Sequence, residues 1–331
     1  MRIAIVKLSA LGDIVHAMVV LQFIKKFNQE ISIDWFVEDQ FKYLLEDHPH
    51  INKVHLVNLK KAKKKKSLSH LFKELRRLKS FGHYDLVIDL QGILKSAIIS
   101  KLISSDNTVG FDRMSARESL SSFFYNRVFN LSYDKNVIER NFELTKFSLK
   151  LPYIYEDIKF KSPFLFFKDH YPSLEFNNNK KNILLIPGAS HDSKRYPIEK
   201  FIKLIELFDA NYFVIWGNIN EKILAKKIES ASSKVTVSEE LSLPELVSYV
   251  SKMDAIIGPD TGPTHIAWAL NKPSITLYGP TPGYRNSYIT KKNQVIESES
   301  LVNPYKIDKN DYSICSIDPH RISKVLQKIL Y

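Results

Sequence analysis

The sequence predicts an α/β protein of two halves, each a parallel β-sheet covered by helices on both faces. Apolar strands and amphipathic helices alternate along two separate stretches, and this alternation is typical of parallel sheets with helical crossovers. A polar stretch of weak periodicity, residues 169–182, lies between them and is predicted to be a linker. The length of 331 residues agrees with two globular domains.

The first half is predicted to begin with a strand at residues 2–7, a short loop SALGD and a helix at 14–27. Apolar residues recur at helical spacing there, and Gly12 with Asp13 suits a tight turn and a helix N-cap. Further strands are expected at 31–37, 54–59 and 85–89, and helical patterns at 41–46, 68–79 and 93–103. The pattern weakens between residues 112 and 170.

The second half shows a similar alternation. Its strands are expected at residues 182–186, 212–216, 255–257 and 274–278, and its helices at 198–208, 221–230, 243–251 and 264–270. Two Rossmann-like halves follow from this pattern, with no repeat of solenoid period. A ligand is expected between the halves, in the crevice at the carboxyl ends of the strands.

The composition is that of a soluble globular protein, with 44% apolar and 25% charged residues. It excludes a disordered chain, a collagen-like repeat and a disulfide scaffold. Cys315 is the only cysteine, so no intramolecular disulfide can form and a reducing compartment is expected. No uncharged run approaches the roughly eighteen residues of a membrane span, and the chain is expected to be soluble and cytoplasmic.

The formal charge of +12 calls for an anionic partner. Nucleic acid, an acidic membrane surface and a phosphorylated substrate all fit a basic chain. Six lysines occupy the seven positions 60–66, with no acidic residue among them. Either this run is a solvated loop that favours solubility, or it binds an acidic ligand, such as an anionic substrate of the protein.

Candidate polar clusters follow directly after predicted strands. Asp13 is either a helix cap or a carboxylate that accepts a proton in the crevice. The loop PGASHDSK leaves backbone N–H groups at Gly188 and Ser190 beside Lys194, a combination that can hold a phosphate. The absence of a GxGxxG motif argues against an NAD-dependent dehydrogenase.

The segment DTGPTHIAWAL is the strongest local signal. Thr261 and Gly262 start a predicted helix directly after a strand, which makes an anion site at the helix N-terminus. His265 lies in the same helix and would face the same crevice. Each residue also has a structural interpretation, Asp260 as a plain N-cap and His265 as a buried structural histidine.

Four segments together resemble the lipopolysaccharide heptosyltransferases of glycosyltransferase family 9. They are SALGDIVHAM, YDLVIDLQGILKSA, the ARE at 116–118 and DTGPTHIAWAL followed by ITLYGPT, and they span nearly the whole chain in the family's order. The resemblance implies a GT-B fold, with two Rossmann-like domains facing each other across a cleft. Their expected bounds are 1–170 for acceptor binding and 171–318 for nucleotide-sugar binding, with a final helix at 319–331 packing back on the first domain.

The resemblance also implies an inverting glycosyl transfer that needs no cofactor and no metal. The lack of a DxD motif and of a His/Cys ligand cluster agrees with this. The donor would be ADP-heptose, the acceptor the Kdo sugar of Kdo-lipid A, and the setting the anionic cytoplasmic face of the inner membrane. Transfer to an already heptosylated acceptor, the heptosyltransferase II activity, remains an alternative. A nucleic-acid-binding protein would explain the charge but not the paired α/β pattern, and no nucleic acid partner is expected.

The family's site residues carry over by position. Asp13 matches the general base and Lys194 the group that neutralises the departing phosphate. The donor-side positions are Ser190, Glu221, Leu241, Asp260, Thr261, Gly262 and His265, and the acceptor-side positions are Lys7, Lys60, Lys61, Lys64 and Arg117. Ala189 stands where the family often has a second hydroxyl. Lysines alone fill a loop where relatives favour arginine, which loses bidentate phosphate contacts.

Overall fold

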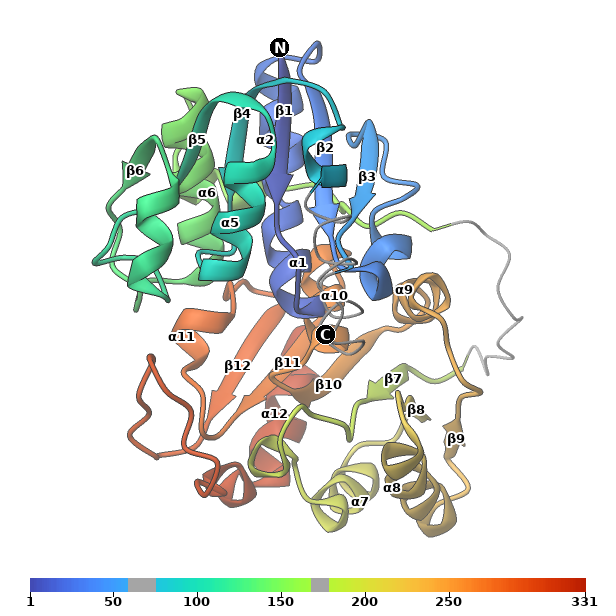
Figure 1. Cartoon of the computed structure of the whole chain (residues 1–331). Helices are drawn as coiled ribbons and strands as arrows, with labels where there is room; N and C mark the ends of the chain where they lie inside the picture. Colours follow the sequence, from blue (N-terminus) through green and yellow to red (C-terminus); the bar gives the residue numbers. More distant parts are fainter. Residues whose placement is uncertain (59–75, 168–178) are drawn as a thin grey trace. The chain divides into compact units, whose positions relative to one another are not determined.

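The computed structural model describes residues 1–58, 76–167 and 179–331 and contains two parallel six-stranded sheets (Figure 1). The predicted α/β class is therefore confirmed. The chain divides into two compact units, Met1–Lys161 and Ser162–Tyr331. The boundary expected between residues 170 and 171 lies outside the described residues. Within the described ranges, no helix is long and apolar enough to cross a membrane.

The sheet of the first unit has the strand order β3-β2-β1-β4-β5-β6. Its strands are β1 (Arg2–Val6), β2 (Ser32–Val37), β3 (Lys53–Leu56), β4 (Tyr84–Asp89), β5 (Ser105–Phe111) and β6 (Arg127–Phe129). The helices are α1 (Leu11–Met18), α2 (Val20–Phe27), α5 (Leu94–Leu102) and α6 (Val137–Leu149), with 3-10 turns η1 (Asp39–Leu44), η2 (Ser119–Phe124) and η3 (Tyr155–Phe160). All five strand pairings are parallel.

Two expectations for this unit need correction. The single helix expected at 14–27 is two short helices, α1 and α2, joined at Val19. The region where the sequence pattern weakens contains a strand and a helix, β6 and α6. The side chain of Asn136 accepts a hydrogen bond from the Ile138 N–H at 2.9 Å and caps α6, and an asparagine at this place is a local signal of a helix start.

The sheet of the second unit has the order β12-β11-β10-β7-β8-β9. Its strands are β7 (Asn182–Leu185), β8 (Asn211–Val214), β9 (Val235–Val237), β10 (Ala255–Pro259), β11 (Ser274–Tyr278) and β12 (Asn293–Glu297). The helices are α7 (Ile198–Leu207), α8 (Ile219–Ala231), α9 (Leu243–Ser251), α10 (Gly262–Ala269), α11 (Gly283–Asn286) and α12 (Pro319–Leu330), with 3-10 turns η4 (Asp192–Lys194) and η5 (Ser313–Ser316).

Both sheets have the same strand order in terms of chain sequence, one counted from the opposite edge of the other. In each sheet the order reverses between the first and the fourth strand, at β1 and β4 in the first unit and at β7 and β10 in the second. Ligands of doubly wound sheets bind at the carboxyl ends of the strands beside this reversal. The loops after these four strands are therefore the places to look for a site.

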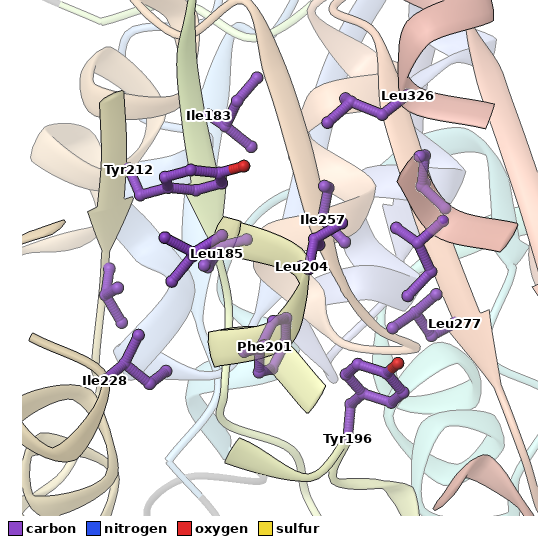
Figure 2. Packing of buried hydrophobic residues seen from close by; sticks show 14 of the residues in the cluster. Ile183, Leu185, Tyr196, Phe201, Leu204, Tyr212, Ile228, Ile257, Leu277 and Leu326 are labelled. Carbon is purple, nitrogen blue, oxygen red and sulfur yellow. The ribbon is translucent and has the colours of Figure 1, made fainter. Parts of the chain in front are cut away.

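The last helix belongs to the core of the second unit (Figure 2). It packs against α7 and β11, and its residues Ile322 and Leu326 are fully buried. The expectation that residues 319–331 also pack back on the first unit stays a prediction. The two side chains are four residues apart and so lie on one face of α12, which covers the apolar side of its own sheet.

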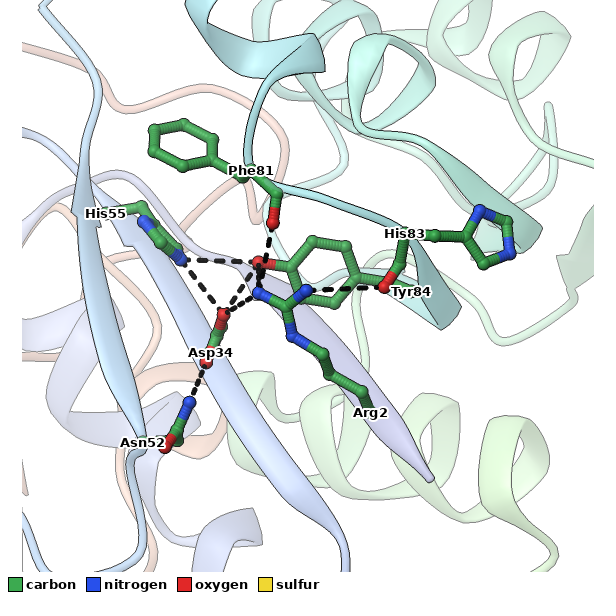
Figure 3. Close-up of polar contacts among 7 residues, drawn as sticks. All are labelled: Arg2, Asp34, Asn52, His55, Phe81, His83 and Tyr84. Atoms are coloured by element: carbon green, nitrogen blue, oxygen red, sulfur yellow. Dashed lines mark hydrogen bonds and ion pairs between the residues drawn. The ribbon is translucent and has the colours of Figure 1, made fainter.

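A buried polar cluster joins four strands at the amino end of the first sheet (Figure 3). Asp34 accepts hydrogen bonds from Arg2 Nη2 and the Tyr84 hydroxyl, both at 2.7 Å, and from Asn52 Nδ2 at 2.9 Å. Its Oδ2 also lies 3.0 Å from His55 Nε2. Burial alone would raise the pKa of Asp34, but these partners hold it well below its usual range. Asp34 is therefore an ionised anchor of the fold.

Candidate active site

Lys194 and Asp260 bridge the two loops beside the strand-order reversal of the second sheet. Lys194 ends the 3-10 turn η4 in the loop after β7, and Asp260 directly follows β10. The Lys194 Nζ lies 2.8 Å from Asp260 Oδ2, and the two side chains are only 10% and 11% exposed. Two predicted site residues from distant parts of the chain are thus brought together as a nearly buried ion pair.

Asp260 is surrounded by polar groups from α10, β11, α11 and the turn between β11 and α11. His265 Nε2 lies 3.0 Å from Oδ1, and the Thr281 hydroxyl donates to Oδ2 at 3.1 Å. Asn286 Nδ2 and the Tyr278 hydroxyl lie further out, at 3.4 and 3.5 Å. Burial would raise the pKa of Asp260, but the Lys194 ammonium and His265 hold it well below its usual range.

The N-cap of α10 is Thr261, so the interpretation of Asp260 as a plain N-cap is wrong. Helix α10 begins at Gly262, next in sequence to this cap and two residues after Asp260. The positive end of the helix dipole and the Lys194 ammonium therefore both lie near Asp260, at the carboxyl end of β10. Such a pairing suits a bound diphosphate. Ser190 is exposed in the loop after β7.

Glu221 lies against the same loop from another direction. Its Oε2 accepts a hydrogen bond from the Gly217 N–H at 2.8 Å, and its own N–H is capped by Asn218 Oδ1 at 3.1 Å. A Cβ added at Gly188 would lie 2.4 Å from the Glu221 Cδ, so the glycine makes room for the carboxylate. Leu241, the predicted adenine contact, is half-buried after β9. Glu221 is thus held beside the loop predicted to bind phosphate.

Asp13 is the third residue of α1, directly after β1 and its loop. The N-cap of α1 is Ala10, so the interpretation of Asp13 as the N-cap is wrong, but its Oδ2 accepts a hydrogen bond from the Ala10 N–H at 3.2 Å and so stabilises the helix start. Its role as a base stays a prediction. Lys7 is 4% exposed and its Nζ donates to the Leu90 carbonyl at 2.9 Å, which turns this side chain into the fold.

The remaining predicted positions are less constrained by the structure. Arg117 is exposed on the first unit. Lys60, Lys61 and Lys64 lie outside the described residues. In the described part of the chain, no group of three or more His, Cys, Asp and Glu side chains is placed to hold a metal ion.

Several polar residues at the strand ends were not predicted as site residues. Tyr278 ends β11 and Thr281 lies three residues later, both in the segment ITLYGPT, and Asn286 ends the short helix α11. Asp89 ends β4, and Gln91 lies two residues later. Both segments carry the family resemblance, but the contacts of side chains within them depend on the strand order, which local sequence patterns do not contain.

Comparison with known proteins gives a consistent result. The model of glycosyltransferase family 9 (heptosyltransferase) matches residues 69–311. A lipopolysaccharide heptosyltransferase 1 of Campylobacter coli is 39% identical over 344 residues, with 99% of each chain covered. The protein of that name from Escherichia coli K12 is 30% identical over 315 residues, covering 92% of this chain and 96% of the relative. The structure of the E. coli heptosyltransferase WaaC with ADP superposes with a TM-score of 0.82 at 25% identity, covering 99% and 100%.

Proposed function

Because this chain belongs to glycosyltransferase family 9, we propose that it transfers L-glycero-D-manno-heptose from ADP-heptose to the Kdo of Kdo-lipid A. The chain is a glycosyltransferase. The full-length likeness to enzymes named lipopolysaccharide heptosyltransferase 1, and to a heptosyltransferase solved with ADP, supports this donor and this acceptor. The transfer inverts the anomeric carbon and releases ADP.

The observation that carries the proposal is the ion pair between Lys194 and Asp260 beside the start of α10. Negative charge grows on the diphosphate as the bond to the sugar breaks, and fixed positive groups lower the energy of that transition state. Lys194 supplies an ammonium that Asp260 holds in place. The first turn of α10, at Gly262, supplies the positive end of a helix dipole.

The remaining site residues have the roles that their positions in the family imply. Glu221 binds the ribose of the donor through its carboxylate, and Leu241 contacts the adenine. Thr261 and His265 bind the sugar and the diphosphate, with Ser190 as a further phosphate contact. Asp13 in the first unit takes the proton from the acceptor hydroxyl as that oxygen attacks, which is the action of a general base.

The acceptor also indicates where the enzyme works. Kdo-lipid A carries a carboxylate and phosphates and resides in a membrane, so a basic chain has a matching surface at the cytoplasmic face of the inner membrane. The six lysines at 60–66 can contribute about 1 kcal/mol each to binding of an anionic lipid surface when well placed. We expect Lys60, Lys61, Lys64 and the exposed Arg117 to contact the acceptor.

The decisive experiment compares two acceptors. The enzyme is incubated with ADP-heptose and either Kdo-lipid A or heptosyl-Kdo-lipid A, and the products are identified by mass. One added heptose on Kdo-lipid A and none on the second acceptor is the expected result. Addition to the heptosylated acceptor alone would replace the proposal with heptosyltransferase II activity, and addition to neither would refute both.

A further inference from the structure

The pairing of β1 with β4 continues past the end of β1 through a side chain. The Leu90 N–H donates to the Val6 carbonyl at 3.1 Å, the last main-chain bond between these two segments. Further along the same segment, the N–H groups of Leu8 and Ser9 both donate to Gln91 Oε1, at 3.0 and 3.3 Å. A carboxamide oxygen thus takes the place of a main-chain acceptor where β4 has turned away.

Neighbouring contacts hold the same segment on its other sides. The Leu90 carbonyl accepts a hydrogen bond from the Lys7 Nζ at 2.9 Å. Trp35 Nε1 donates to the Lys7 carbonyl at 3.1 Å. The Glu38 N–H donates to the Leu8 carbonyl, also at 3.1 Å. Together with the two hydrogen bonds to Gln91, these contacts hold residues 7–9 in place.

Gln91 is itself held by a buried carboxylate. Asp89, fully buried at the end of β4, accepts from the Gln91 N–H at 2.8 Å and from the Gly92 N–H at 3.2 Å through Oδ1. Its Oδ2 accepts from the hydroxyls of Ser96 and Tyr125, at 2.7 and 2.8 Å. Gly92 has φ +68, the left-handed conformation that lets the chain turn sharply here. The backbone from which Gln91 extends is therefore fixed.

We propose that Gln91 is a positioning residue for the reaction and that it acts through the loop before α1. Its Oε1 fixes the N–H of Ser9, and the N–H of the next residue, Ala10, holds the Asp13 carboxylate. Release of the loop would let Asp13 shift from the position in which it can take the acceptor's proton. The inference rests on the proposed function, in which Asp13 is the base.

The test replaces Gln91 with two residues of similar length. Gln91→Met removes the acceptor oxygen and should lower kcat about ten- to a hundredfold, the usual scale for a displacement of about 1 Å at a reacting group. Gln91→Glu keeps an acceptor oxygen at the same place and should restore at least a third of the wild-type kcat. The Kd for ADP should change less than twofold in both variants, because the proposed ADP site lies in the second unit.

Two further variants separate positioning from simple stabilisation. Gln327→Met, on the exposed side of α12, is the matched control and should behave as wild type. The double variant Asp13→Asn/Gln91→Met should be no more than threefold slower than Asp13→Asn alone, because both changes act on the same group. A purely structural Gln91 would lower the Tm of Gln91→Met and leave kcat within twofold at temperatures well below that Tm.

The outcomes distinguish this inference from the proposed function. If Asp13→Asn is inactive and Gln91→Met has a normal kcat, the positioning role of Gln91 is refuted and the proposed function stands. A Gln91→Glu variant as slow as Gln91→Met also overturns it, since the oxygen is then not what matters. An Asp13→Asn variant that retains more than a tenth of wild-type kcat refutes the base and, with it, the positioning of that base.

Discussion

A methyl group at Gly188 should displace the carboxylate that we assign to the donor's ribose. In Gly188→Ala, the added Cβ would lie 2.4 Å from the Glu221 Cδ and 2.6 Å from each carboxylate oxygen. Ordinary contacts of this kind begin near 3.4 Å, so the end of the Glu221 side chain must move by about 1 Å. No positive φ is involved, and the fold should tolerate the alanine.

The expected loss is that of one hydrogen bond to a charged group. Such a bond contributes about 1.5 to 3 kcal/mol. At 1.4 kcal/mol for each factor of ten, the Kd for ADP should rise about ten- to a hundredfold. Gly217→Ala is the matched control, because its Cβ would lie 3.4 Å from the Glu221 Oε2, an ordinary contact, and should change this Kd much less.

Isothermal titration calorimetry with ADP measures these values, and circular dichroism checks that each variant is folded. The effect of Gly188→Ala should vanish in a Glu221→Ala background, since the displaced group is then already absent. If the loss of ADP affinity persists in that background, the added methyl group clashes with the phosphates of ADP and not with Glu221. A Gly188→Ala variant with unchanged Kd for ADP would refute the reasoning.

The remaining predictions concern three charged groups. Asp13→Asn should lower kcat by about two to four orders of magnitude while the Kd for ADP stays near wild type; a tenth of normal turnover would leave Asp13 with its contact at the start of α1 only. Lys194→Ala should raise the barrier by about 2 to 4 kcal/mol in steady-state assays, and Lys194→Arg should recover part of this. Wild-type turnover should persist in excess EDTA; loss in EDTA with recovery on adding magnesium would contradict this leaving-group assignment. Asp34, with its lowered pKa, stabilises the fold above about pH 4 and loses this contribution as the pH falls, because the unfolded chain then takes up the proton. In urea unfolding, Asp34→Asn should therefore cost about 2 kcal/mol at pH 7 and clearly less at pH 3; an equal cost at both pH values would contradict it.

The central strands of both sheets were predictable because they are continuous apolar runs between polar loops. Strands such as β6 and β9, of three residues each, lie at sheet edges and carry too few side chains for a periodic signal. The helix at 319–331 has a clear apolar face, but a face does not state which sheet it covers. The structure shows that this helix covers the sheet of the second unit, and its predicted packing on the first unit stays a prediction.

The candidate site could likewise be predicted only in part from the sequence. Loops that follow strands were predictable, and so were Lys194 and Asp260 as separate residues. Their pairing joins positions 66 residues apart, and the contact of Gln91 with Leu8 joins positions 83 residues apart. Both depend on which strands are neighbours in the sheet, and local patterns do not contain that information.

Asp260 gives Lys194 a counter-ion before any donor arrives. A diphosphate entering the site must share the ammonium with this carboxylate, so the resting complex gains less than it would from an unpaired lysine. As charge accumulates on the departing phosphate, the ammonium can shift its interaction toward it, so it stabilises the transition state more than the bound donor. The same internal competition also weakens the hold on ADP once transfer is complete. We therefore expect the ion pair to favour product dissociation, so that the site is cleared between cycles without a separate opening signal.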